Sequence, residues 1–104
     1  MIPGIFVQRI DWKGIAIEVS YEPDWLCLSA SGGPAMAHLQ IRSVCPERAA
    51  LPMTETGYRS HFVPPRTVVD HGGPVAYTLG WLEEAERSPV WREQQEAARQ
   101  FVLL

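Results

Sequence analysis

Residues 15–21 read Ile-Ala-Ile-Glu-Val-Ser-Tyr, and in this stretch large apolar side chains alternate with small or polar ones. Alternation with a period of two is typical of a β-strand that buries one face. The preceding residues 5–10 (IFVQRI) are apolar and β-branched enough for a second strand, and the turn sequence of residues 11–14 (DWKG) separates the two. The sequence therefore predicts a β-hairpin with one buried face.

Two further strands are predicted after the hairpin. Residues 35–44 alternate cleanly, with inward positions at Ala37, Leu39, Ile41 and Ser43 and outward positions at His38, Gln40 and Arg42. Residues 58–63 (YRSHFV) form a fourth strand that Pro64 and Pro65 stop. Residues 45–57 between them hold two prolines and a glycine without any sustained period, which predicts a long ordered loop.

Helix signals fill the rest of the chain. Residues 66–71 are expected to make one helical turn, and Pro74 suits the first position of a longer helix. Ser88 and Pro89 repeat a helix start, as N-cap and first residue, for a helix that runs to about Gln100. Strands followed by helices predict the α+β class: an antiparallel sheet of about four strands, with two C-terminal helices packed on one face.

Length and composition narrow the class of protein. A chain of 104 residues is expected to form a single domain over residues 1–104. The net charge of -3 disfavours non-specific binding to nucleic acid or anionic lipid. The N-terminus does not resemble a secretory signal and no apolar run is long enough to span a bilayer, so we expect a cytoplasmic protein. Cys27 and Cys45 are then expected to be free, partly buried thiols.

The most polar stretch, residues 54–62, suggests one enzyme or ligand site. Its candidate residues are Glu55, Tyr58, Arg59 and His61. Strand alternation would place Ser60 and His61 on opposite faces, which excludes a nucleophile–base pair between them. The favoured interpretation is therefore an ordered loop whose side chains bond their own backbone. Without CxxC, HExxH or HxH spacing, we assign no catalytic residue, no metal site and no cofactor.

Three surface features remain as candidates for binding. The terminal helices concentrate acids at Glu83, Glu84, Glu86, Glu93 and Glu96, and Trp12 and Trp25 lie in turns, where they either anchor a partner or fold back over the sheet. Four apolar residues, Phe101, Val102, Leu103 and Leu104, end the sequence and predict either internal packing or a homodimer contact. A nucleic-acid-binding regulator would instead use Arg42, Arg48, Arg59 and Arg66.

Three segments carry a resemblance to small proteins of bacterial genomes, plasmids and phages. They are residues 51–62 (LPMTETGYRSHF), residues 38–43 (HLQIRS) and residues 72–75 (GGPV). The resemblance transfers no catalytic residue. It implies a mobile-element protein, a class that includes inhibitors of host defence such as anti-CRISPR proteins, which act by binding. The leading hypothesis is thus a non-enzymatic inhibitor whose acidic helical face occupies a basic, nucleic-acid-binding surface of its target.

Overall fold

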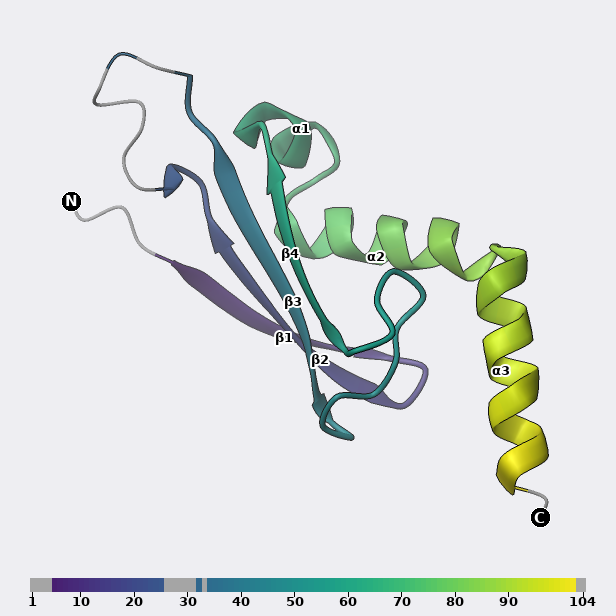
Figure 1. The fold of residues 1–104 in the computed structure, drawn as a ribbon. Coiled ribbons are helices and arrows are strands. Elements are labelled where there is room, and N and C mark those ends of the chain that lie inside the picture. The colour runs from purple at the N-terminus through teal and green to yellow at the C-terminus, as the bar shows by residue number, and fades with distance from the viewer. Residues whose placement is uncertain (1–4, 26–31, 33, 103–104) are drawn as a thin grey trace.

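The structure is a computed structural model that describes residues 5–25, 32 and 34–102, with side chains described as far as residue 97 (Figure 1). Cys27, Leu103 and Leu104 lie outside the described residues, as do the side chains of Phe101 and Val102. The expectations for a Cys27 thiol and for an apolar C-terminal contact therefore stay predictions.

Four strands form one antiparallel sheet in the order of the sequence. The strands are β1 (Phe6–Trp12), β2 (Ile15–Glu22), β3 (Ala37–Cys45) and β4 (Tyr58–Val63). Lys13 and Gly14 form the tight turn between β1 and β2, both with positive φ, 47° and 83°. The predicted hairpin and both further strands are confirmed, and β4 has the predicted bounds.

The helices follow the sheet, which confirms the α+β class. They are α1 (Pro65–Asp70), α2 (Pro74–Glu86) and α3 (Pro89–Val102). Helix α2 packs against the sheet near β2 and buries Thr78 and Leu82, while α1 buries Val68 (Figure 1). Helix α3 leaves the end of α2 at an angle and lies beside the loop before β4, where Trp91 packs on Trp12 with ring centroids 6.3 Å apart.

Strand register divides the sheet into two faces. Opposite pairs on the face toward the helices include Ile17 with Ser43, Val19 with Ile41 and Tyr21 with Leu39. All of these side chains are buried, and together with residues of the loop and helices they make the core. The core residues are Trp12, Ile17, Val19, Tyr21, Ala37, Leu39, Ile41, Leu51, Val63, Val68 and Leu82. The predicted inward positions of β3 are confirmed.

The long loop between β3 and β4 is ordered, as predicted, and it also closes one end of the core. Leu51 is buried and pairs with Thr54 in an isolated β-bridge. The backbone N–H of Ser43 donates to the carbonyl of Gly57 at 2.8 Å, and the Ser43 hydroxyl donates to the carbonyl of Ala49 at 2.7 Å. These bonds satisfy a buried polar side chain that would otherwise be costly.

Two sequence expectations change. Trp12 is 8% exposed and belongs to the core. Of the two alternatives for Trp12, an anchor for a partner or a side chain folded back over the sheet, the structure shows the second. The Cys45 thiol is free but exposed rather than partly buried, because Cys45 ends β3 where the strand leaves the core. Within the described residues, no helix combines the length and the apolar character that a membrane span requires.

Candidate binding surfaces

The face of the sheet that no helix covers, here called the open face, carries polar and aromatic side chains. Strands β2, β3 and β4 contribute Glu18, Ser20, His38, Gln40, Arg42, Tyr58, Ser60 and Phe62. These residues alternate with the core residues along the same strands, so burial of one set places the other set on this face.

An aromatic cluster occupies one end of the open face. The rings of His38 and Phe62 are stacked, with centroids 4.4 Å apart and planes at 8°. Trp25, which follows β2, contacts Phe62 edge-on at 4.8 Å and lies 5.9 Å from His38. A backbone hydrogen bond of 2.8 Å from Trp25 to Met36 fixes this position at the start of β3. Phe62 nevertheless remains 46% exposed.

Hydrogen bonds organise the polar part of the open face. The Tyr58 hydroxyl donates to Gln40 Oε1 at 2.8 Å, and Arg42 forms an ion pair with Glu18 at 2.8 Å. His38 Nε2 and Ser60 Oγ share a hydrogen bond of 2.6 Å. These cross-strand bonds restrict the rotamers of the side chains on the open face.

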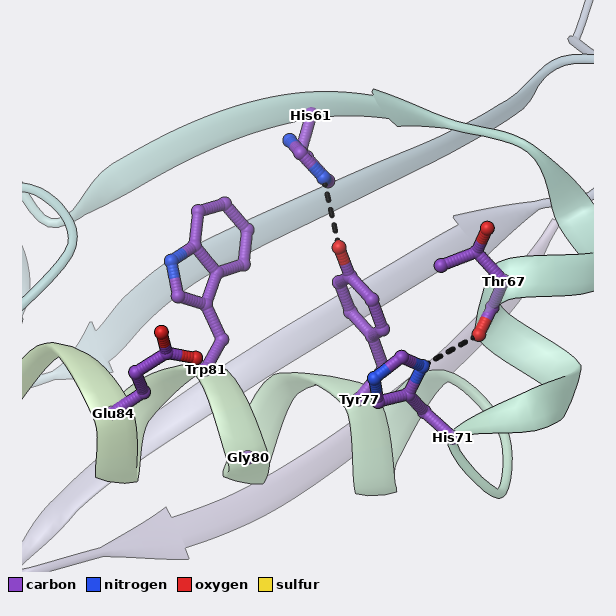
Figure 2. A pocket seen from close by; sticks show the side chains of 7 residues that line it. All are labelled: His61, Thr67, His71, Tyr77, Gly80, Trp81 and Glu84. Atoms are coloured by element: carbon purple, nitrogen blue, oxygen red, sulfur yellow. Dashed lines mark hydrogen bonds between the residues drawn. The ribbon is translucent and has the colours of Figure 1, made fainter.

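A pocket lies on the other side of the sheet, between β4 and helices α1 and α2 (Figure 2). We call it the helix-side pocket. It has a volume of about 430 Å³ and is lined by His61, Thr67, His71, Tyr77, Gly80, Trp81 and Glu84.

Two histidines are held in fixed orientations at the helix-side pocket. His61 Nε2 lies 3.0 Å from the Tyr77 hydroxyl, and the His61 ring lies 4.6 Å from Trp81 (Figure 2). His71 Nδ1 donates to the backbone carbonyl of Thr67 at 2.7 Å. Burial lowers the pKa of His61 below its ordinary 6.5, and the nearby Arg59 guanidinium lowers this pKa further. His61 is therefore neutral at pH 7.

The open face and the helix-side pocket both lie in the part of the chain that matches a known family. The family described as KlcB third domain matches residues 6–91, which include the sheet, α1, α2 and the start of α3. The chain belongs to this family. KlcB third domains are associated with plasmid-borne proteins. Searches of the curated proteins and of the solved structures found no match.

The predicted ligand site of this KlcB third domain is not assembled. Tyr58 points to the open face, whereas Arg59 and His61 lie on the helix side of the sheet. Glu55 lies in the loop and accepts a hydrogen bond from Gln94 of α3. The four side chains are thus distributed over both sides of the sheet. Within the described residues, no group of three or more His, Cys, Asp and Glu is arranged to hold a metal ion.

The predicted bonding of loop side chains to local backbone is confirmed for Thr54 and Thr56, but not for Glu55, which bonds the Gln94 side chain of α3 instead. The Thr54 and Thr56 hydroxyls donate to the backbone carbonyl of Tyr58, at 2.8 and 3.3 Å. These side chains bond local backbone before the chain enters β4, as the interpretation without a catalytic role requires.

The four predicted arginines do not form one basic patch. Arg42 is paired with Glu18 on the open face, and the Arg59 guanidinium lies 5.6 Å from the Trp81 ring on the other side of the sheet. Arg48, in the loop, lines a hollow together with Arg42, whereas Arg66 is in α1. The fold thus brings Arg42 and Arg48 together but places Arg59 on the other side of the sheet.

The predicted acidic face is divided. Glu86 is paired with Lys13 from the β1–β2 turn, which connects α2 to the hairpin. The remaining four acids are exposed: Glu83 and Glu84 on α2, and Glu93 and Glu96 on α3. Helices α2 and α3 meet at an angle, so the two pairs of acids lie on helices that run in different directions (Figure 1).

Sequence reasoning missed both the aromatic cluster and the helix-side pocket as sites. Trp25, His38 and Phe62 are separated along the chain, and only the strand pairing brings them together. The pocket had a readable signal: Tyr77, Gly80, Trp81 and Glu84 recur at helical spacing, with a glycine in the interior of a helix.

Proposed function

We propose that this KlcB third domain is a non-enzymatic protein-interaction module that binds a protein partner through the open face. The observation that carries the proposal is the aromatic cluster of Trp25, His38 and Phe62. A large aromatic ring that is 46% exposed, on a sheet face without a covering helix, is the kind of residue that anchors protein interfaces.

Charge supports a protein partner rather than a nucleic acid. Arg42 is already paired with Glu18 on the open face, and the chain as a whole carries a net charge of -3. Aromatic stacking on single-stranded nucleic acid normally accompanies a positively charged groove. The combination of exposed aromatic rings with neutral or paired polar groups fits the mixed chemistry of a protein surface.

The partner we propose is a component of a host defence system, so that the domain acts as a plasmid- or phage-encoded inhibitor of the anti-CRISPR type. The association of the family with plasmid-borne proteins supports this direction. The exposed acids Glu83, Glu84, Glu93 and Glu96 would add a second contact with a basic, nucleic-acid-binding surface of the target.

Site-specific photocrosslinking tests which surface binds. A photoreactive phenylalanine analogue is placed at position 62 or 58 on the open face, and each variant is expressed in bacterial cells. We expect a discrete protein adduct from both positions. Phe62→Ser should abolish the adduct formed from position 58, because loss of the central ring removes the anchor of the cluster.

Position 69 is the matched control, since Val69 is apolar and 70% exposed and lies on α1 rather than on the strands that make the open face. It should give no adduct. An adduct from position 69 as strong as that from position 62 contradicts the proposal. An adduct only from positions 83 and 84, abolished by Glu83→Lys and Glu84→Lys, would transfer the function to the acidic helices.

A further inference from the structure

The helix-side pocket is not part of the open face, since it lies on the opposite side of the sheet from the aromatic cluster; it shares only Glu84 with the acids proposed as a second contact. Its lining nevertheless comes from separate elements of the fold that together form a defined cavity. Tyr77, Gly80, Trp81 and Glu84 lie on one side of α2, because positions three and four residues apart in a helix are neighbours (Figure 2). His61 of β4 covers them from above, and α1 supplies the remaining wall.

Gly80 contributes a part of the wall that carries no side chain. A Cβ added at Gly80 would meet no atom within 4 Å, so packing does not require glycine at this position. Glycine weakens the interior of a helix relative to alanine. Its consequence here is open space at the wall of the cavity, which a larger residue at position 80 would occupy.

The lining presents hydrogen-bond acceptors and aromatic faces. His71 donates from Nδ1 to the Thr67 carbonyl, which leaves Nε2 as the ring nitrogen that can contact a ligand. Glu84 is exposed and contributes a carboxylate. Trp81 and Tyr77 contribute π-systems whose faces attract cations. With histidines counted as neutral, the lining carries a negative charge from Glu84.

The molecule itself uses one of these aromatic rings to hold a cation. The Arg59 guanidinium lies 5.6 Å from the centroid of Trp81, and Arg59 does not line the pocket. Trp81 is therefore an established partner for a guanidinium group within this fold. Arg59 would also repel a second cation weakly. Removal of the Arg59 charge therefore tests whether the ligand is positively charged.

We infer that the helix-side pocket binds a guanidinium or ammonium group, with Glu84 as its counter-ion and with Tyr77 and Trp81 as its aromatic walls. The cation is either an arginine or lysine side chain of a protein or a free small amine; the chemistry of recognition is the same for both. The inference is independent of the open face, so failure of the crosslinking experiment leaves it standing.

NMR titration of the Trp81 indole N–H measures binding directly, with the signal assigned by its loss in Trp81→Phe. The probes are methylguanidinium, N-acetyl-argininamide, and the anionic N-acetyl-aspartamide as the charge control. We expect saturable shifts with both cations in the millimolar range and no saturable shift with the anion. An alanine peptide with one central arginine that binds more tightly than methylguanidinium identifies a protein side chain, and equal affinities identify a small free cation.

Four variants locate the site. Glu84→Gln should weaken binding by about tenfold, since a charge-assisted hydrogen bond is lost. Glu83→Gln, the same change one residue away and outside the pocket, should leave affinity unchanged. Gly80→Leu should abolish binding by filling the cavity. Arg59→Gln should strengthen binding by about twofold, because a nearby positive charge is removed.

The inference is overturned if neither cation shifts the Trp81 signal in the folded wild-type protein. It is equally overturned if the anionic probe binds as well as the cations, or if Glu84→Gln and Glu83→Gln have the same effect. Because Glu83 and Glu84 are both exposed, these two variants are expected to remain folded, and a null result cannot be assigned to unfolding.

Discussion

The two faces of the sheet are built from alternate residues of the same strands, yet they differ in almost every physical property. On β3, Leu39 and Ile41 are fully buried under the helices, whereas Gln40 between them faces the open side and bonds Tyr58. On β4, His61 contacts the helix-side residues Tyr77 and Trp81, and its neighbour Phe62 belongs to the exposed cluster.

Residues that stabilise the core and residues proposed to bind a partner are therefore one position apart along a strand. The helix-side face supplies the apolar burial that drives folding, roughly 25 cal/mol per Å² of apolar surface. The open face contributes side chains that are already fixed by cross-strand contacts but still accessible. Substitutions on one face should therefore change stability, and substitutions on the other should change binding with little effect on stability.

The largest expected effect compares Leu39 with Gln40. Leu39→Ala should lower the free energy of unfolding by about 2–5 kcal/mol, because it leaves a cavity in the core. Gln40→Ala should change it by only about 0.5 kcal/mol, because an exposed hydrogen bond is replaced by water. Urea denaturation of both variants measures the contrast. Comparable losses would mean that the open face also carries folding energy.

A second comparison uses two glycines with positive φ. Gly57 has φ 78°, and a Cβ there would lie 2.7 Å from the carbonyl carbon of Arg48. Gly57→Ala should cost about 2–4 kcal/mol, from the left-handed backbone plus the clash. Gly14→Ala in the hairpin turn, at φ 83° with nothing within 4 Å, should cost about 1 kcal/mol.

Gly57 matters to the comparison of faces because its carbonyl accepts the N–H of Ser43 at the end of the buried side. Both alanine variants share the cost of a left-handed backbone, and only Gly57→Ala adds a clash. The difference between their thermal midpoints therefore measures the cost of the clash. Equal midpoints would show that the loop moves away without disturbing the core.

The smallest expected effect concerns the pH dependence contributed by His61. Its pKa is lowered in the folded protein by burial and then by Arg59, so the unfolded chain takes up the proton first as pH falls below 6.5. Stability should be complete above pH 6.5 and decline below it. His61→Gln should flatten this decline, measured by thermal midpoints between pH 5 and 8. Arg59→Gln should move the pKa of His61 back toward its ordinary value in an NMR titration.

An opposite result, with wild-type stability rising relative to His61→Gln as pH falls below 6.5, would mean that the folded protein favours the charged imidazole. His61 would then have to face an anion, and the neutral ring assigned to the helix-side pocket would be wrong.

Local patterns were sufficient for much of the fold. Alternation located β2 and β3 and assigned their inward residues, and the two prolines after Val63 ended β4. Proline signals also located the starts of α2 and α3. These features depend on backbone preferences and on periodic burial, both of which are visible over a few residues.

Contacts between distant segments were not predictable in the same way. Leu51 has no periodic neighbours, yet the loop folds back and buries it in the core. Trp12 lies beside a turn, and only the position of Trp91 on α3 shows that it is covered. The ligand site proposed around Glu55 and Arg59 failed for a related reason, since residues close in sequence were separated by the strand pleat and by the loop.

The amino-acid sequence was enough to predict the order of strands and helices, the alternating inward residues of β2 and β3, and the excess of acids on the last helices. The aromatic cluster of Trp25, His38 and Phe62 and the pocket lined by Tyr77, Gly80 and Trp81 are visible only in the folded chain. Period and propensity act between near neighbours, whereas a binding surface is defined by strand register and helix packing across the whole chain.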